Sequence, residues 1–215
     1  MFNLPVDTLN FNIGCSVAEF LNLIEDGERR LYLYGEITSA DEDQDEFFPT
    51  TSPVSALVRK IFQINLADKD IPIEERKPII LYINSPGGNL VEGFALVSAI
   101  ELSKTPVYTV NVGEWCSMAF LIGIVGTKRY SLPYMTFLMH EASSISVGKI
   151  SSMEDKIEFD RDFSRQVIKT CILRHSTMSD KDYDLVAKKE LYMLPERAKD
   201  FGFIDEIVTD IDTIL

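Results

Sequence analysis

The chain has 215 residues and a formal net charge of −13, so nucleic acid, whose phosphates would repel it, is excluded as the expected partner. Its length and its 46% hydrophobic residues suit one domain that buries roughly 70% of the surface of the unfolded chain. No run approaches the ~18–20 apolar residues of a membrane span, and the first residues lack a basic-then-apolar signal pattern, so we expect no membrane partner. An odd number of cysteines without metal-ligand spacing favours the reducing cytoplasm over secretion: Cys15, Cys116 and Cys171.

The N-terminal third predicts two helices and one strand. Apolar residues at helical spacing predict a helix between Cys15 and Gly27, in an N-terminal segment that we assign to residues 1–30. Residues Arg30–Tyr34 predict a strand. An acidic run follows within an insertion at residues 39–52, where like charges favour a solvated segment, and a helix is expected from Val54 to Leu66.

A glycine turn then separates a strand from a helix. The apolar run Ile79–Ile83 predicts a buried strand, and a helical pattern follows from Asn89 to Lys104. Between them, Gly87 and Gly88 follow a proline, so the backbone can turn its N–H groups towards a ligand. Those groups could serve as oxyanion donors or only connect the two elements. A phosphate cradle is disfavoured, because no phosphate-binding glycine motif is present.

Ser117 lies between a strand-like run, Val107–Val112, and an apolar helical segment, Met118–Val125. At such a turn the hydroxyl stands at a helix N-terminus, where free N–H groups favour the negative charge that forms when a carbonyl is attacked. This placement predicts a nucleophile. Serine is also a favoured N-cap, so a purely structural role is the alternative.

The chain has only two histidines, and each ends a different element. His140 follows the apolar run Met135–Met139, which predicts a buried strand, and it could act as a general base towards a serine at a neighbouring strand end. A structural histidine is the alternative. His175 ends a long helical pattern over residues 148–175 and is expected to interact with the helix dipole. The narrow apolar stripe of that pattern suits projection and partner contact.

Taken together in this order, four motifs across residues 79–205 resemble the proteolytic subunit of the Clp protease: Tyr82–Gly88, Cys116–Met118, Met139–His140 and Ala198–Asp205. The resemblance implies an α/β fold, a spiral of strand–helix units shared with crotonase-type enzymes such as enoyl-CoA hydratases. It also implies a single peptidase domain over residues 1–215, with residues 148–175 as a projecting handle.

The resemblance also implies the roles of individual residues. Ser117 would be the nucleophile, His140 the general base, and the backbone N–H groups of Gly88 and Met118 the oxyanion hole. The third triad member is usually aspartate, and an alignment without gaps from His175 to Asp205 places Glu190 there.

Several residues depart from the family pattern. Glutamate can hold an imidazole tautomer as aspartate does. Glu190 could instead be a solvated surface charge. In that case the candidates for the third triad member are Asp182 and Asp184. The interval from Ser117 to His140 is slightly shorter than is usual in the family. Bulkier residues also stand in place of small ones before the serine, which predicts a narrower or differently shaped pocket: Glu114, Trp115 and Cys116.

The implied function is that of a self-compartmentalising serine endopeptidase subunit. It would form a heptameric ring, possibly doubled, and hydrolyse unfolded polypeptides fed by an AAA+ unfoldase. The sequence has no nucleotide motif, so we expect no cofactor or metal on this chain and ATP use by the unfoldase. Two alternatives stay open: a catalytically weak or inactive ring or scaffold subunit, and an acyl-CoA enzyme of the crotonase superfold, which would need catalytic carboxylates near its CoA site.

Overall fold

The computed structural model of the chain describes residues 29–39, 52–141, 149–187 and 189–214. The helix predicted between Cys15 and Gly27 lies outside these residues, as does the acidic run within 39–52. Across the described part of the chain, no helix is both long enough and apolar enough to span a bilayer.

Parallel strands form most of the sheet, which agrees with the expected α/β fold. Its main path runs β1-β2-β3-β4-β7, and every neighbouring pair on this path is parallel. The strands are β1 (Arg30–Tyr34), β2 (Ile79–Ser85), β3 (Val107–Cys116), β4 (Lys128–Ser131) and β7 (Glu206–Ile207). Two further strands, β5 (Thr136–Met139) and β6 (Leu191–Met193), leave this path: β5 pairs in parallel with the end of β3, and β6 pairs antiparallel with β5.

The strand β3 is longer than the sequence predicts. The expected strand ends at Val112, whereas β3 continues to Cys116. The extension has partners that are distant in sequence, because Glu114–Cys116 pair with Thr136–Leu138 of β5 and the Glu114 N–H donates to Asn84 Oδ1 at 3.2 Å. The extension carries the chain to Ser117 without an intervening loop.

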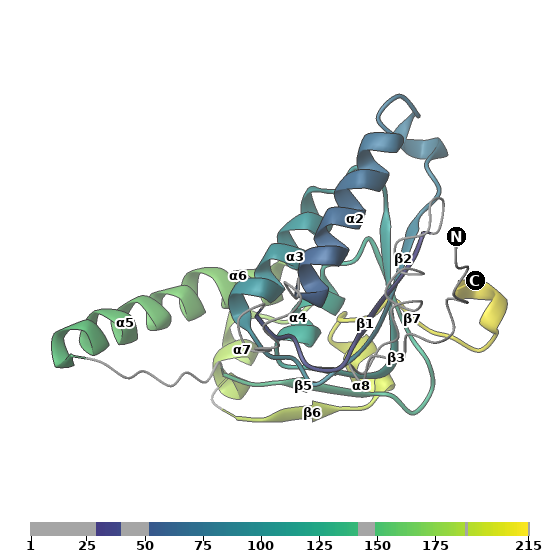
Figure 1. The fold of residues 1–215 in the computed structure, drawn as a ribbon. Helices are drawn as coiled ribbons and strands as arrows, with labels where there is room; N and C mark the ends of the chain where they lie inside the picture. Colours follow the sequence, from purple (N-terminus) through teal and green to yellow (C-terminus); the bar gives the residue numbers. More distant parts are fainter. Residues whose placement is uncertain (1–28, 40–51, 142–148, 188, 215) are drawn as a thin grey trace, which may run out of the picture.

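Three helices pack on one face of the sheet (Figure 1). They are α2 (Pro53–Ala67), α3 (Leu90–Leu102) and α4 (Met118–Ile124). Side-chain caps begin two of them: Ser52 Oγ accepts from the Ser55 N–H of α2, and Asn89 Oδ1 accepts from the Val91 and Glu92 N–H groups of α3. Their buried residues and the inner face of the sheet form the main core.

The opposite face of the sheet has a smaller apolar cluster. It comprises Tyr82, Val110, Tyr130, Val208 and Ile214. The C-terminal 3-10 turn, Ile211–Ile214, covers part of this face, and the Tyr82 hydroxyl donates to the Ile214 carbonyl at 2.6 Å.

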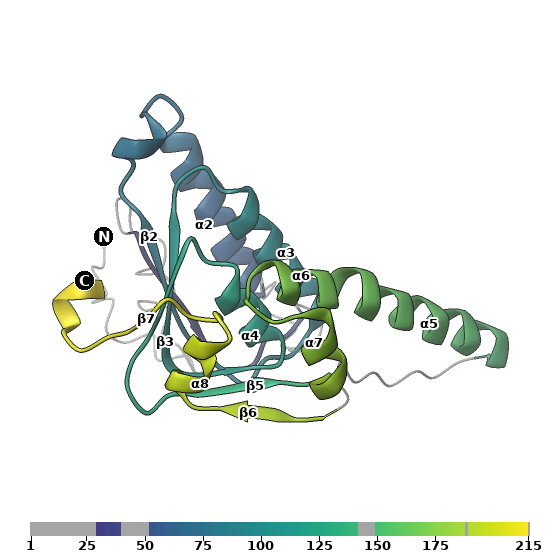
Figure 2. The ribbon, with the colours of Figure 1, turned by 180° about the vertical axis from the view of Figure 1, so that it is seen from behind.

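The predicted long helix over residues 148–175 is interrupted by a π-helical turn. It consists of α5 (Ile150–Phe163), the π turn at Ser164–Ile168 and α6 (Lys169–Arg174). Both views show α5 extending away from the sheet (Figures 1 and 2), and none of its residues is buried. His175 caps the C-terminus of α6, as predicted, and its Nε2 lies 2.8 Å from Glu101 Oε1.

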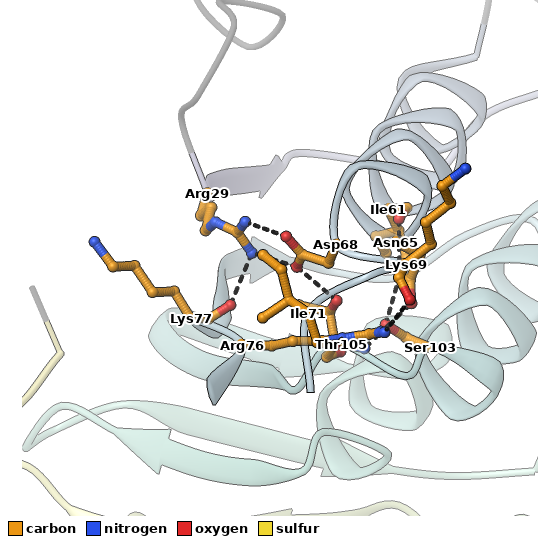
Figure 3. Close-up of polar contacts among 10 residues, drawn as sticks. All are labelled: Arg29, Ile61, Asn65, Asp68, Lys69, Ile71, Arg76, Lys77, Ser103 and Thr105. Carbon is orange, nitrogen blue, oxygen red and sulfur yellow. Dashed lines mark hydrogen bonds and ion pairs between the residues drawn. The ribbon is translucent and has the colours of Figure 1, made fainter. Parts of the chain in front are cut away.

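A buried carboxylate joins three segments near the start of β1 (Figure 3). Asp68, the C-cap of α2, is 1% exposed and forms a two-point ion pair with Arg29, with nitrogen–oxygen distances of 2.6 and 2.8 Å. The Thr105 hydroxyl donates to the same carboxylate at 2.8 Å. The hydrogen bond from Arg29, opposed by burial, lowers the pKa of Asp68.

Asp68→Asn is expected to lower the free energy of unfolding by about 1–3 kcal/mol at neutral pH, because it removes a charge-assisted hydrogen-bond acceptor from a buried site. The Asp68 pKa is lower in the folded state than the unfolded value of about 3.9, so the contribution is present above that value and is lost as the pH falls through the folded pKa. Denaturant unfolding measures the effect. Asp70→Asn is the matched control, because the Asp70 side chain is 88% exposed, and an equal loss in both variants would contradict the assignment.

Candidate active site

Ser117 occupies a strained turn between β3 and α4. Its backbone has φ 55° and ψ −121°, a conformation that side-chain-bearing residues rarely adopt. It stands at the N-cap position of α4, but its side chain makes no capping hydrogen bond. Its N–H donates to the Leu138 carbonyl of β5 at 2.9 Å. Ser117 therefore stands at the N-cap position without making the capping bond, so capping does not engage its hydroxyl.

The glycine turn after β2 packs directly against Ser117. Gly87 has φ 98°, and a Cβ there would lie 2.7 Å from the Ser117 Cβ and 2.9 Å from the Met118 nitrogen. Gly88 has φ 139°, and a Cβ there would collide with the Ile37 carbonyl. Only glycine fits these two positions without strain, and its absence of a side chain lets the turn approach the start of α4.

The two predicted oxyanion donors, Gly88 and Met118, belong to the two segments that make this close approach. Met118 is the first residue of α4, and N–H groups in the first turn of a helix have no acceptor within that helix. Ile37 forms hydrogen bonds with both neighbours of Gly88. Its N–H donates to the Gly87 carbonyl, and its carbonyl accepts from the Asn89 N–H. The Gly88 N–H itself donates to no acceptor in the described part of the chain.

His140 and Ser117 line the same small cavity. Both follow the ends of neighbouring parallel strands, because Cys116 of β3 is paired with Leu138 of β5. No hydrogen bond joins the Ser117 hydroxyl to the His140 ring, and such contacts often tighten only when substrate binds. The remaining cavity walls are apolar: Leu90, Met118, Phe120, Leu121, Met139, Ile168 and Ile172.

Glu190 directly precedes β6, at the edge of the sheet next to β5. The last antiparallel pair is Met139 with Leu191, and the residues that directly adjoin this pair are His140 after β5 and Glu190 before β6. Glu190 is exposed, and no hydrogen bond joins it to His140. The predicted acid and the predicted base therefore adjoin the same end of the β5–β6 pair, without a contact between them.

The two substitute acids, Asp182 and Asp184, are engaged elsewhere. Asp182 forms a capping box with Ser179 at the start of α7 (Asp180–Val186). The Asp184 carboxylate accepts from Lys169 Nζ at 2.8 Å. Neither carboxylate contacts His140.

Comparison with known proteins identifies the family. A family model described as Clp protease matches residues 58–210, more than half of the chain. The chain belongs to the Clp protease family. It is also similar to the ATP-dependent Clp protease proteolytic subunit 1 of Streptomyces avermitilis, with 29% identity over 143 residues. The match covers 66% of this chain and 65% of that relative, so the chain spans just under two-thirds of the relative's length.

The Clp protease match covers every predicted site residue. The structure corrects one expectation about the shape of the pocket. Trp115 does not narrow the pocket, because its ring is fully buried in the core, with Phe137 at 5.5 Å between ring centroids and with Gly123. Strand alternation explains the difference, since Trp115 faces the core while Glu114 and Cys116 face the other side of the sheet.

Cys116, adjacent to Ser117, was not among the predicted site residues, although it is a possible competing nucleophile. Its Sγ donates to Glu114 Oε2 at 3.3 Å. Burial, together with this hydrogen bond and the charge of Glu114, raises the pKa of Cys116 to about 12. The thiol is therefore protonated at neutral pH, which makes it a poor nucleophile.

Proposed function

We propose that this chain is a serine endopeptidase subunit of the Clp type. One observation carries the proposal: Ser117 and His140 line one cavity, and the Gly87–Gly88 turn packs against Ser117 and the Met118 nitrogen. Segments that are distant in sequence and packed against one another therefore carry a hydroxyl, an imidazole and two candidate N–H donors. This is the set of groups that acyl transfer requires.

In the proposed reaction, Ser117 Oγ attacks the carbonyl carbon of a peptide bond while His140 takes the hydroxyl proton. The carbonyl oxygen becomes an oxyanion and accepts hydrogen bonds from the Gly88 and Met118 N–H groups. His140 then gives the proton to the leaving amine, and an acyl-enzyme remains on Ser117. Water attacks this ester in the same way and releases the acid.

The two backbone donors are expected to contribute strongly to the rate. Each oxyanion donor in a serine protease is worth about 10²–10³ in turnover. Here both donors belong to rigid backbone, because the glycine turn is held by Ile37 and the Met118 nitrogen begins a buried helix. Little reorganisation is needed when the charge forms. Glu190 would orient the imidazole from the neighbouring strand.

We also propose that the subunit works in an assembly. The strand–helix units would follow the family's spiral, and α5 would be the handle of a heptameric ring that is doubled into a chamber. This is supported by the exposed apolar residues on the extended α5, because such side chains suit burial against another subunit: Ile150, Ile157 and Phe159. The name of the relative includes ATP dependence. In our proposal, an AAA+ unfoldase in the cytoplasm uses the ATP and feeds unfolded polypeptides to the chamber. This chain itself would bind no cofactor.

A fluorophosphonate probe applied to the native particle tests the activity and the assembly in one sample. We expect covalent labelling of Ser117, located by peptide mass spectrometry, in a particle whose native mass corresponds to a ring or a double ring. Heat-unfolded protein is the control, because labelling needs the assembled site. An assembled particle without labelling would favour the scaffold alternative. The observation that supports this alternative is that no hydrogen bond joins Ser117 to His140.

A further inference from the structure

The strand β6 carries a tyrosine, Tyr192, that has no role in the reaction proposed above. Tyr192 lies two residues after Glu190, so the two side chains project from the same side of the strand. The alternate residues Leu191 and Met193 are buried in the core, whereas the Tyr192 residue is 60% exposed. Glu190 and Tyr192 are therefore neighbours on the open face of the sheet.

The two groups interact. The negative charge of Glu190 is the largest cause that raises the pKa of Tyr192, so the phenol and the carboxylate lie close enough for their charges to interact. The phenol is thus protonated at neutral pH and can donate its hydrogen to the carboxylate, which only accepts when it is ionised.

The register places His140 at the same end of the β5–β6 pair as Glu190. Tyr192 is paired with Leu138, and Leu191 with Met139, so Glu190 and His140 are the residues that adjoin the end of this pairing. Leu138 and His140 alternate with the buried Phe137 and Met139, which places them on the same open face as Tyr192. The carboxylate consequently has a phenol along its own strand and an imidazole at the same end of the strand pair.

We propose that Tyr192 is a positioning residue for Glu190, and this inference rests on the proposed function. The phenol donates to one carboxylate oxygen and leaves the other oxygen directed at His140. Glutamate has one more rotatable bond than the aspartate that is usual in the family, so an exposed Glu190 without a second contact would sample several rotamers. The hydrogen bond from Tyr192 restricts that freedom.

Tyr192→Phe tests the proposal, because it removes the hydroxyl and keeps the ring. We expect kcat for a fluorogenic peptide to fall roughly tenfold, with KM unchanged, on the scale of one hydrogen bond to a charged group. In a Glu190→Gln background the same substitution should have little further effect, since the two residues act as a unit. Tyr134→Phe is the matched control, because Tyr134 is 91% exposed and lies on a different turn, between β4 and β5.

A titration of the phenol gives a readout that does not need activity. The difference in tyrosinate absorbance between the wild-type protein and Tyr192→Phe reports the pKa of Tyr192. Glu190→Gln should lower that pKa, because it removes the charge that raises it. An unchanged pKa overturns the contact. A lowered pKa with unchanged kcat in Tyr192→Phe overturns the positioning role alone, whereas a wild-type protein that neither reacts with the probe nor cleaves peptide overturns the proposed function and the positioning role together.

Discussion

Ser117→Ala is expected to lower kcat for peptide hydrolysis by about 10⁶-fold, the scale seen when the nucleophile is removed from a serine protease. The adjacent Cys116 is not a ready replacement, because its thiol has a pKa of about 12 and is protonated at neutral pH. The measurement is the hydrolysis of a fluorogenic peptide by the assembled particle.

The alanine variant should keep its fold and its assembly. Alanine retains the Cβ and meets the same φ of 55°, so the backbone strain at position 117 is unchanged. The native mass of the particle checks this point. Ser55→Ala is the matched control, because Ser55 lies on the exposed side of α2 and should retain full activity. Residual activity near the wild-type level in Ser117→Ala would place the nucleophile elsewhere.

Glu190→Gln is expected to lower kcat by up to about 10⁴-fold, because an amide cannot hold the imidazole in the tautomer that accepts the proton of Ser117. The physical reason is that Glu190 and His140 adjoin the same end of the β5–β6 pair, which suits contact between the carboxylate and the imidazole. Glu190→Asp should restore part of the rate, since it returns a carboxylate on a shorter side chain. The measurement is kcat across the pH range.

The control for Glu190→Gln comes from the acids of α7. Asp182→Asn removes a carboxylate of similar exposure, but this carboxylate serves a capping box with Ser179 and does not contact His140. Its turnover should stay at the wild-type level. A loss in Asp182→Asn that matches Glu190→Gln, or an unchanged rate in Glu190→Gln, would remove Glu190 from the triad.

Local patterns predicted most of the elements that carry the site. The run Ile79–Ile83, the pattern after Asn89 and the run Met135–Met139 correspond to β2, α3 and β5. These segments are strongly apolar and have sharp ends, so hydrophobic periodicity is a reliable guide to them. The end of β3 was missed because Gly113 and Glu114 are poor strand formers, and their extended conformation depends on β5 and Asn84.

The π-helical turn at Ser164–Ile168 was also missed. Its residues continue the helical pattern of α5 into α6, and no glycine or proline marks the change. A π turn differs from an α turn by one residue in its hydrogen bonds, which apolar spacing does not reveal over five residues.

The sequence by itself determined the chemistry that is available: a serine at a strand-to-helix turn, a histidine at a strand end, a pair of glycines after a strand and a glutamate near the C-terminus. It also determined the family, through motifs that recur in order. Only the tertiary structure decided which of these groups lie near one another. Gly87 approaches Met118, Ser117 shares a cavity with His140, and Glu190 adjoins the same end of the β5–β6 pair as His140. All three depend on strand pairing between segments that are far apart in the chain. Such pairing is set by the packing of the whole core, which local patterns do not encode.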